Sequence, residues 1–211
     1  MSAQLGLFGH EAPRFDAGFR ELKRKDLAGG AWVEYAPGWV AGHAALFEEL
    51  SRTIDWQSGE EHIYDRVLPT PRLYAVLPAH GGPHPLIEAM REALSARYGE
   101  AFTRVSMALY RNGRDSVAWH GDRVARRMRE ALVATVSVGA PRRFMLRPHG
   151  GGRSVAWNLG WGDLFVMGGS CQRTWQHAIP KVARAEPRIA IMFRPTWEPE
   201  AEASDGDAES V

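Results

Sequence analysis

The first half of the chain contains two segments in which apolar residues recur at helical spacing. Leu46, Leu50 and Ile54 mark one face of a helix predicted over residues 42–53, and a similar pattern predicts a second helix over 86–98. A helix with one apolar face must bury that face against another element. We therefore expect both helices to brace the sheet that the rest of the chain forms.

From residue 102 onward the apolar pattern shortens to that of β-strands, and glycine-containing turns separate the segments. Strands are expected near 103–110, 116–119, 132–138, 142–147, 153–158, 162–167, 173–178 and 187–194. Short strands at this spacing are typical of a double-sheet jelly roll. The predicted fold class is α+β: a double-stranded β-helix (jelly-roll) core braced by N-terminal helices.

The remaining segments lack a clear period. Residues 1–28 are polar and irregular, which predicts a loosely ordered N-terminal arm, and residues 29–197 are expected to form one domain. Within that domain, 56–79 has no helical period and contains three prolines, which predicts extended segments and turns. Residues 198–211 are acidic and poor in large apolar side chains, so we expect a disordered tail.

Composition adds little about the partner but something about the compartment. The chain of 211 residues is 45% hydrophobic and 24% charged, which is ordinary for a globular domain. It has no apolar stretch of the roughly 18 residues that a membrane span needs, and its N-terminus lacks the pattern of a signal peptide. Cys171 is the single cysteine, which excludes an internal disulfide. We expect a cytoplasmic monomer that does not associate with membranes.

Three residues form a candidate metal site. His120 and Asp122 lie two apart on an extended segment, so their side chains share a face and can reach one ion. His177, on a later strand, is the expected third ligand; His149, in a glycine-rich turn, is the alternative. Two imidazoles and one carboxylate are the ligand set of mononuclear iron(II) oxygenases, which leave positions open for an oxo-acid and dioxygen.

A candidate anion site follows in the chain. Arg188 and Arg194 lie six apart, on one face of an apolar strand, and the guanidinium group matches a carboxylate with two hydrogen bonds. Taken alone, the two arginines also suit the solvated ends of a strand. The metal motif upstream favours an anion clamp, to which Tyr110 can add a hydroxyl donor. Iron ligands followed by such a clamp predict a 2-oxoglutarate-dependent dioxygenase.

The segment 107–195 resembles the AlkB-type dioxygenases, which remove alkyl groups from nucleic-acid bases by oxidation. The resemblance rests on the order and spacing of 109–113, 119–122, 136–140, 162–167 and 187–195, and 70–73 resembles a segment that precedes the family's substrate lid. Several short segments, among them 168–175, resemble a bacterial branch of the family.

The resemblance implies roles for individual residues. It makes His120, Asp122 and His177 the Fe(II) ligands, and it implies that Tyr110, Arg188 and Arg194 hold 2-oxoglutarate, with Arg188 on the far carboxylate. Dioxygen is the other co-substrate, and succinate, carbon dioxide and an aldehyde are the implied products. The chain departs from the family at three positions: Ala108 and Ala190 stand where Asn is frequent, and Val124 stands where members acting on adenine or cytosine often have an acid.

Nucleic acid is the substrate that this resemblance implies: alkylated single- or double-stranded DNA, or RNA. An enzyme that takes a base out of its stack needs aromatic surfaces and phosphate-binding cations. The candidates are Trp56, Tyr64, Arg66, Arg72 and Tyr74, in a nucleotide-recognition lid over 56–79, together with Arg123, Arg126, Arg127 and Arg129 beside the metal motif. Two alternatives stay open: a hydroxylase or demethylase of a protein or small molecule, and a nucleic-acid-binding protein without turnover.

Overall fold

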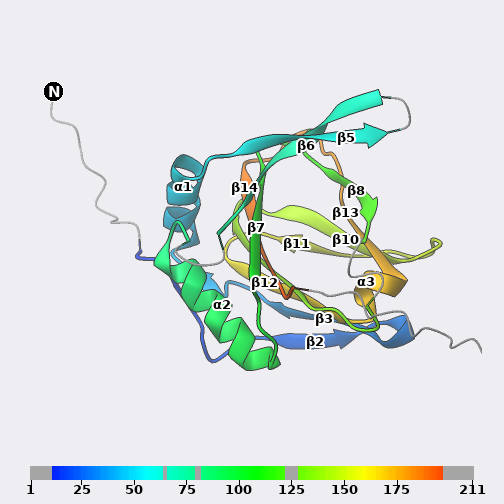
Figure 1. The fold of residues 1–211 in the computed structure, drawn as a ribbon, viewed down its shortest axis with the longest axis horizontal. Helices are drawn as coiled ribbons and strands as arrows, with labels where there is room; N and C mark the ends of the chain where they lie inside the picture. The colour runs from blue at the N-terminus through cyan, green and yellow to red at the C-terminus, as the bar shows by residue number, and fades with distance from the viewer. Residues whose placement is uncertain (1–10, 64–65, 79–81, 122–127, 197–211) are drawn as a thin grey trace, which may run out of the picture.

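The protein is a sandwich of two antiparallel sheets, with two helices on the outer face of the larger sheet (Figure 1). The computed structural model describes residues 11–63, 66–78, 82–121 and 128–196, with the backbone alone described at 60–63 and 66–70. The described part of the chain shows the predicted combination of a jelly-roll core and bracing helices.

The larger sheet has eight strands in the order β2-β3-β12-β9-β14-β7-β6-β5. These strands are β2 (Lys23–Asp26), β3 (Ala31–Ala36), β12 (Asp163–Gly169), β9 (Val133–Gly139), β14 (Arg188–Arg194), β7 (Arg104–Tyr110), β6 (Arg66–Val76) and β5 (Gln57–Ile63). The smaller sheet has four strands in the order β11-β10-β13-β8. They are β11 (Val155–Leu159), β10 (Arg142–Pro148), β13 (Trp175–Ile179) and β8 (Val117–His120). A short pair joins β1 (Arg14–Phe15) to β4 (Val40–Ala41).

The two predicted helices are α1 (His43–Thr53) and α2 (Pro85–Tyr98). The His84 Nδ1 atom accepts a hydrogen bond from the Leu86 N–H at 3.0 Å, which caps the start of α2, and Gly99 ends the helix with a φ of 65°. Leu46 and Leu50 of α1 are fully buried against the larger sheet. None of the described helices has the length and apolar character needed to cross a bilayer.

Alternate side chains of β14 point to opposite faces of the larger sheet, so this strand contributes to both layers of the core. Ile189, Ile191 and Phe193 face the helices and belong to the outer core, whereas the intervening residues 188, 190, 192 and 194 face the smaller sheet. A second core cluster lies between the two sheets and includes Phe144 and Phe165, whose ring centroids are 5.1 Å apart. The site-forming residues therefore lie in the inner layer of the sandwich.

The described part of the N-terminal segment, 11–28, is packed on the domain, so the prediction of a loosely ordered arm was wrong there. Strand β2 pairs with β3, and the Phe19 ring stacks on Trp39 with a centroid distance of 5.5 Å. The Trp39 Nε1 atom also donates to the Asp16 carbonyl at 2.8 Å. Strand β2 is an exposed edge strand composed of charged residues, a composition that protects sheet edges from aggregation and conceals the strand in a hydrophobic pattern.

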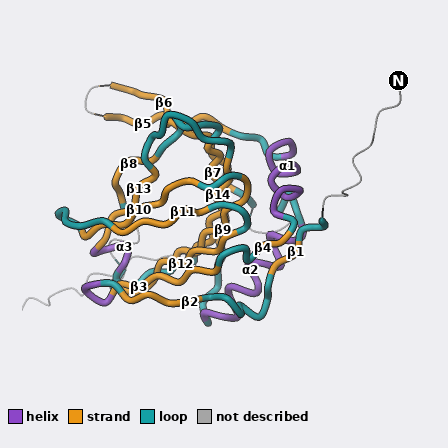
Figure 2. Tube along the Cα trace, turned by 180° about the vertical axis from the view of Figure 1, so that it is seen from behind, coloured by secondary structure: helices purple, strands orange, loops and turns teal. Residues whose placement is uncertain are grey.

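Two further expectations have clear outcomes. The described part of segment 56–79 is extended, as predicted: β5 and β6 pair at the opposite end of the larger sheet from β2 (Figure 2). The strand expected over 173–178 begins later than predicted, because the short helix α3 (Cys171–Thr174) precedes β13. Residues 1–10 and 198–211 lie outside the described residues, so the arm's first part and the acidic tail stay predictions.

Candidate active site

A pocket of about 340 Å³ opens between the two sheets. The larger sheet contributes the residues of β14 that face inward, together with residues of β6, β7 and β9. The smaller sheet contributes His120 and His177, each from a strand of its own. Two of the three predicted metal ligands and the predicted anion clamp therefore meet in one cavity, from opposite walls.

The two histidines face each other across β8 and β13. They are direct partners in the strand register, and their ring centroids are 4.1 Å apart. The His120 Nδ1 atom lies 2.9 Å from the Ala118 carbonyl oxygen. Because a carbonyl can only accept, Nδ1 is the donor, which leaves Nε2 as the ring nitrogen available to a metal ion. This arrangement provides two neighbouring nitrogen ligands of the kind that a metal ion prefers. Asp122, the expected third ligand, lies outside the described residues.

Arg188 is the most unusual group in the pocket. Its side chain is 1% exposed, and its Nη2 atom donates to the Ser137 hydroxyl at 2.7 Å. Its Nε and Nη1 atoms are buried and have no hydrogen-bond partner in the described structure. Burial lowers the pKa of Arg188 to about 10, so the guanidinium remains charged at neutral pH. A buried cation with two unsatisfied donors that lines a cavity fits an anionic ligand with a carboxylate.

Arg194, at the other end of β14, lines the same pocket and is half-buried. Its Nη1 atom donates to the Ser106 hydroxyl at 2.9 Å. Ser106 lies on β7 and Ser137 on β9, the two neighbours of β14, so each arginine is held by a serine from a different side. The sequence prediction missed both serines; the available signal was a small hydroxyl residue within a mostly apolar strand.

Tyr110 completes this wall of the pocket. It is the direct partner of Arg188 in the register of β7 and β14, and the Arg188 guanidinium carbon lies 5.4 Å from the Tyr110 ring centroid. Burial is the largest influence on the phenol and raises its pKa, so the hydroxyl stays protonated and can donate to an anion. The structure thus brings Tyr110, Arg188 and Arg194 together, as the sequence predicted.

Ala108 and Ala190, two of the three departures from the AlkB pattern, are direct partners across β7 and β14. Both are buried and both line the pocket between the two arginines. The two methyl groups leave that stretch of the wall apolar. Val124, the third departure, lies outside the described residues.

The predicted substrate residues divide into three groups. Arg72 and Tyr74 of β6 line the pocket, and Tyr74 is 41% exposed at its mouth. Trp56 packs against the outer core instead, so its proposed role in the lid is not supported by its position. Tyr64, Arg123, Arg126 and Arg127, and the side chain of Arg66, lie outside the described residues.

His149, the alternative metal ligand, is exposed in the loop after β10, and its backbone N–H donates to the Thr174 carbonyl at 2.7 Å.

Comparison with known protein families identifies the domain. The family model described as the 2OG-Fe(II) oxygenase superfamily matches residues 41–195, well over half of the chain. The chain belongs to this superfamily. The cofactors of the family are Fe(II) and 2-oxoglutarate, with dioxygen as co-substrate.

Curated relatives place the chain near the AlkB homologues within that superfamily. It is 31% identical over 185 residues to the alpha-ketoglutarate-dependent dioxygenase alkB homolog 3 of Bos taurus, covering 76% of this chain and 65% of the relative. It is 30% identical over 133 residues to the DNA oxidative demethylase ALKBH2 of Arabidopsis thaliana, covering 50% of this chain and 42% of that protein. The chain thus spans less than two thirds of the length of these relatives.

Solved structures support the fold. The structure of OsALKBH1 matches 82% of this chain and all of its own, with a TM-score of 0.53 and 13% identity. A prolyl hydroxylase from Trichoplax adhaerens, in complex with a peptide fragment of hypoxia inducible factor, matches 71% of this chain and 73% of its own, with a TM-score of 0.52 and 12% identity. At these identities the matches show the jelly-roll architecture alone.

The residues of the pocket fit the family's cofactors. The imidazole pair of His120 and His177 suits Fe(II), and the unsatisfied N–H groups of Arg188 suit a dicarboxylate such as 2-oxoglutarate. A buried guanidinium without a ligand is costly, so its presence is best explained by a bound carboxylate.

Proposed function

We propose that this protein is an Fe(II)- and 2-oxoglutarate-dependent dioxygenase that removes alkyl groups from nitrogen atoms of nucleic-acid bases. The observation that carries the proposal is the pocket that joins a facing histidine pair to a buried arginine with unsatisfied donors. The products are succinate, carbon dioxide, an aldehyde and the restored base.

The chain's own residues bind and orient the reactants. In the proposed site, His120, Asp122 and His177 hold Fe(II), which together with 2-oxoglutarate supplies the oxidation of the alkyl carbon. Arg188 would bind the far carboxylate of 2-oxoglutarate through its unsatisfied N–H groups, Tyr110 would donate its hydroxyl proton to the co-substrate, and Arg194 would bind near its other end. The apolar pocket residues, Phe144 and Met167 among them, exclude water from the reacting atoms.

The hairpin of β5 and β6 is the proposed contact with the flipped base. Tyr74 and Val76 are exposed at the mouth of the pocket, and Arg72 lies beside them. An aromatic ring at the mouth of a narrow pocket provides a stacking surface for an unpaired base. We expect the hairpin, including Tyr64 and Arg66, to close over the nucleotide.

Charge along the later part of the chain favours a polyanionic partner. Residues 131–185 contain seven lysine and arginine residues but one acidic residue, Asp163, and that residue is buried. This segment contains three of the four strands of the smaller sheet, among them β13 with His177, together with β9 and β12 of the larger sheet. Cations around the site can bind backbone phosphates, in a manner that weakens as the salt concentration rises.

The decisive experiment measures succinate and formaldehyde release with Fe(II) and 2-oxoglutarate. Methylated and unmethylated single strands of DNA and RNA, and a methylated duplex, serve as substrates, with His177→Ala as the inactive control. We expect product in proportion to methylated base, with single strands ahead of the duplex because they need no unpairing. The same set of oligonucleotides shows which base and which nucleic acid the enzyme prefers.

Succinate release that no oligonucleotide stimulates would refute the nucleic-acid substrate and favour a hydroxylase or demethylase of a protein or small molecule. Binding without any turnover would favour the third reading, a binding protein. We further propose that the protein acts as a monomer in the cytoplasm, where the single thiol of Cys171 stays reduced.

A further inference from the structure

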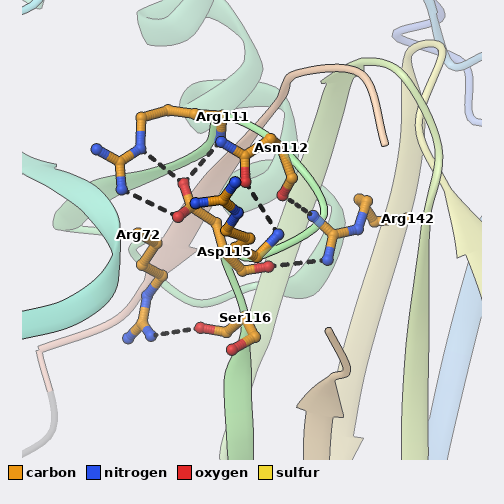
Figure 3. A network of polar contacts seen from close by, with 7 residues as sticks. Arg72, Arg111, Asn112, Asp115, Ser116 and Arg142 are labelled. Atoms are coloured by element: carbon orange, nitrogen blue, oxygen red, sulfur yellow. Dashed lines mark hydrogen bonds and ion pairs between the residues drawn. The ribbon is translucent and has the colours of Figure 1, made fainter. Parts of the chain in front are cut away.

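Arg142, at the start of β10, is buried to 3% exposure yet forms no side-chain ion pair among the described contacts; instead it binds backbone oxygens. Its Nη1 atom donates to the Asn112 carbonyl at 3.0 Å, and its Nη2 atom donates to the carbonyls of Asp115 at 2.8 Å and Pro180 at 3.0 Å. Figure 3 shows the contacts of Arg142 with Asn112 and Asp115. A planar fork of this kind can hold several acceptors at once, which an ammonium group cannot reproduce.

The three acceptors belong to the two segments that carry the histidine pair. Asn112 and Asp115 lie in the loop 111–116, which leads directly into β8 and His120. Pro180 follows β13, which carries His177. The Arg142 guanidinium therefore connects the loop that precedes the strand of His120 with the residue that follows the strand of His177.

Strand β8 needs such a connection, because its own pairing is limited. It is a four-residue edge strand of the smaller sheet, and its register with β13 places His177 opposite His120 and Ile179 opposite Val117. The register shifts between these two pairs. Edge strands with irregular ladders are prone to slippage, and a slip of one residue would turn the imidazole to the other face of the sheet.

Hydrogen bonds hold the loop 111–116 in one conformation, so the contacts of Arg142 with this loop also fix the position of β8. The Asp115 carboxylate accepts hydrogen bonds from both the Arg111 N–H and the Arg111 Nε atom at 2.8 Å, and the Asp115 N–H donates to the Asn112 carbonyl. The Val182 N–H donates to the Gly113 carbonyl at 2.9 Å, which docks the loop on the segment after Pro180 a second time. A Cβ atom at Gly113 would lie 2.2 Å from the Val182 oxygen, so the two segments are in close contact.

We propose that Arg142 is a positioning residue that fixes β8 in the register at which His120 faces His177, and that it thereby sets the affinity of the site for its metal ion. This inference rests on the proposed function, because it concerns the same metal site. Arg142 does not touch the metal or the substrates. It acts through the backbone of the strands that present the two ligands.

The test compares metal binding by wild type, Arg142→Lys and Arg143→Lys, with Co(II) as the probe and visible absorption as the signal, in the absence of 2-oxoglutarate. Arg143 is the adjacent, exposed arginine of β10, so its variant controls for a charge-conserving change on the same strand. We expect Arg142→Lys to bind Co(II) about 10–100-fold more weakly, as is usual when a group that orients metal ligands is lost, and Arg143→Lys to bind it as wild type does. Melting curves of the metal-free proteins report folding separately.

A role in folding alone would lower the melting temperature of Arg142→Lys but leave the Co(II) affinity of its folded fraction unchanged, and that result would overturn the proposal. If Arg142→Lys does not fold, Val182→Pro tests the second contact between the same two segments, because it deletes the backbone N–H that donates to Gly113. Loss of one hydrogen bond should weaken Co(II) binding by about two- to tenfold, and unchanged affinity would again overturn the proposal. If wild type binds Co(II) no better than His177→Ala does, the metal site of the proposed function fails, and this inference fails with it.

Discussion

Arg188 should make the ligand-free protein less stable than a variant that lacks the charge. The guanidinium is buried at 1% exposure; within the described part of the chain it donates one hydrogen bond, to Ser137, and Nε and Nη1 have no partner. Arg188→Met removes the charge and the unsatisfied donors while keeping an unbranched, although shorter, side chain. We therefore expect this substitution to stabilise the protein in the absence of 2-oxoglutarate and to abolish binding of the co-substrate.

The magnitude follows from the contacts. Each buried donor without a partner costs about 1–3 kcal/mol, so the two donors of Arg188 together cost about 2–6 kcal/mol. Against this gain, the Ser137 hydroxyl loses its donor and the shorter side chain packs less well, which together cost about 1–3 kcal/mol. The midpoints of these two ranges differ by about 2 kcal/mol, so a net gain of about 2 kcal/mol is expected. For a protein of this size it raises Tm by about 2–4 °C per kcal/mol.

Thermal unfolding with and without 2-oxoglutarate, in the presence of a redox-inert divalent metal, measures both effects. At a 2-oxoglutarate concentration of about 100 times Kd, wild type should gain about 2.7 kcal/mol, whereas Arg188→Met should gain nothing. Arg194→Met is the matched control: Arg194 is only half-buried and already bonded to Ser106, so its removal should not stabilise the ligand-free protein. A ligand-free Arg188→Met that melts below wild type, or one that 2-oxoglutarate still stabilises fully, would refute the reasoning.

Two further predictions concern the histidines and the mouth of the pocket. His177→Ala should lose Co(II) binding and all turnover while its metal-free melting curve changes little, whereas His149→Ala should behave as wild type; the reverse result would show that His149 is the ligand. Tyr74→Ala should weaken binding of a methylated single strand by about tenfold, since stacking on one aromatic ring contributes about 1–3 kcal/mol, as fluorescence anisotropy can measure. Trp161→Ala removes an aromatic ring that is 62% exposed and is not among the residues lining the pocket, so an equal loss in that variant would argue against a stacking role for Tyr74.

The sequence predicted the elements that a strong period or a long-range motif marks. Both helices and the run of strands from β7 to β14 follow from apolar spacing, and the pairing of Arg188 with Arg194 on one face follows from the two-residue period of β14. The AlkB-like motif correctly placed the histidines of two separate strands in one cavity. Such assignments succeed because burial constrains the whole face of an element.

The groups that the sequence did not reveal act through contacts with residues far away in the chain. Ser137 and Arg142 look like an interior serine and half of an ordinary Arg-Arg pair, and their roles depend on which strand lies beside them in the sheet. Trp56 was assigned to substrate binding by its neighbours in sequence, although the structure packs it on the outer core. The charged strand β2 has no apolar face at all, so periodicity could not detect it.

The division of the pocket between two sheets has a consequence for engineering. The hairpin and both clamp arginines belong to the larger sheet, whereas both histidines belong to the smaller one. Exchanging the β5–β6 hairpin for another sequence would therefore alter a peripheral edge without interrupting any strand that carries a histidine. Substrate selectivity could then be changed by replacing the hairpin, while the strands that carry the histidine pair keep their sequence.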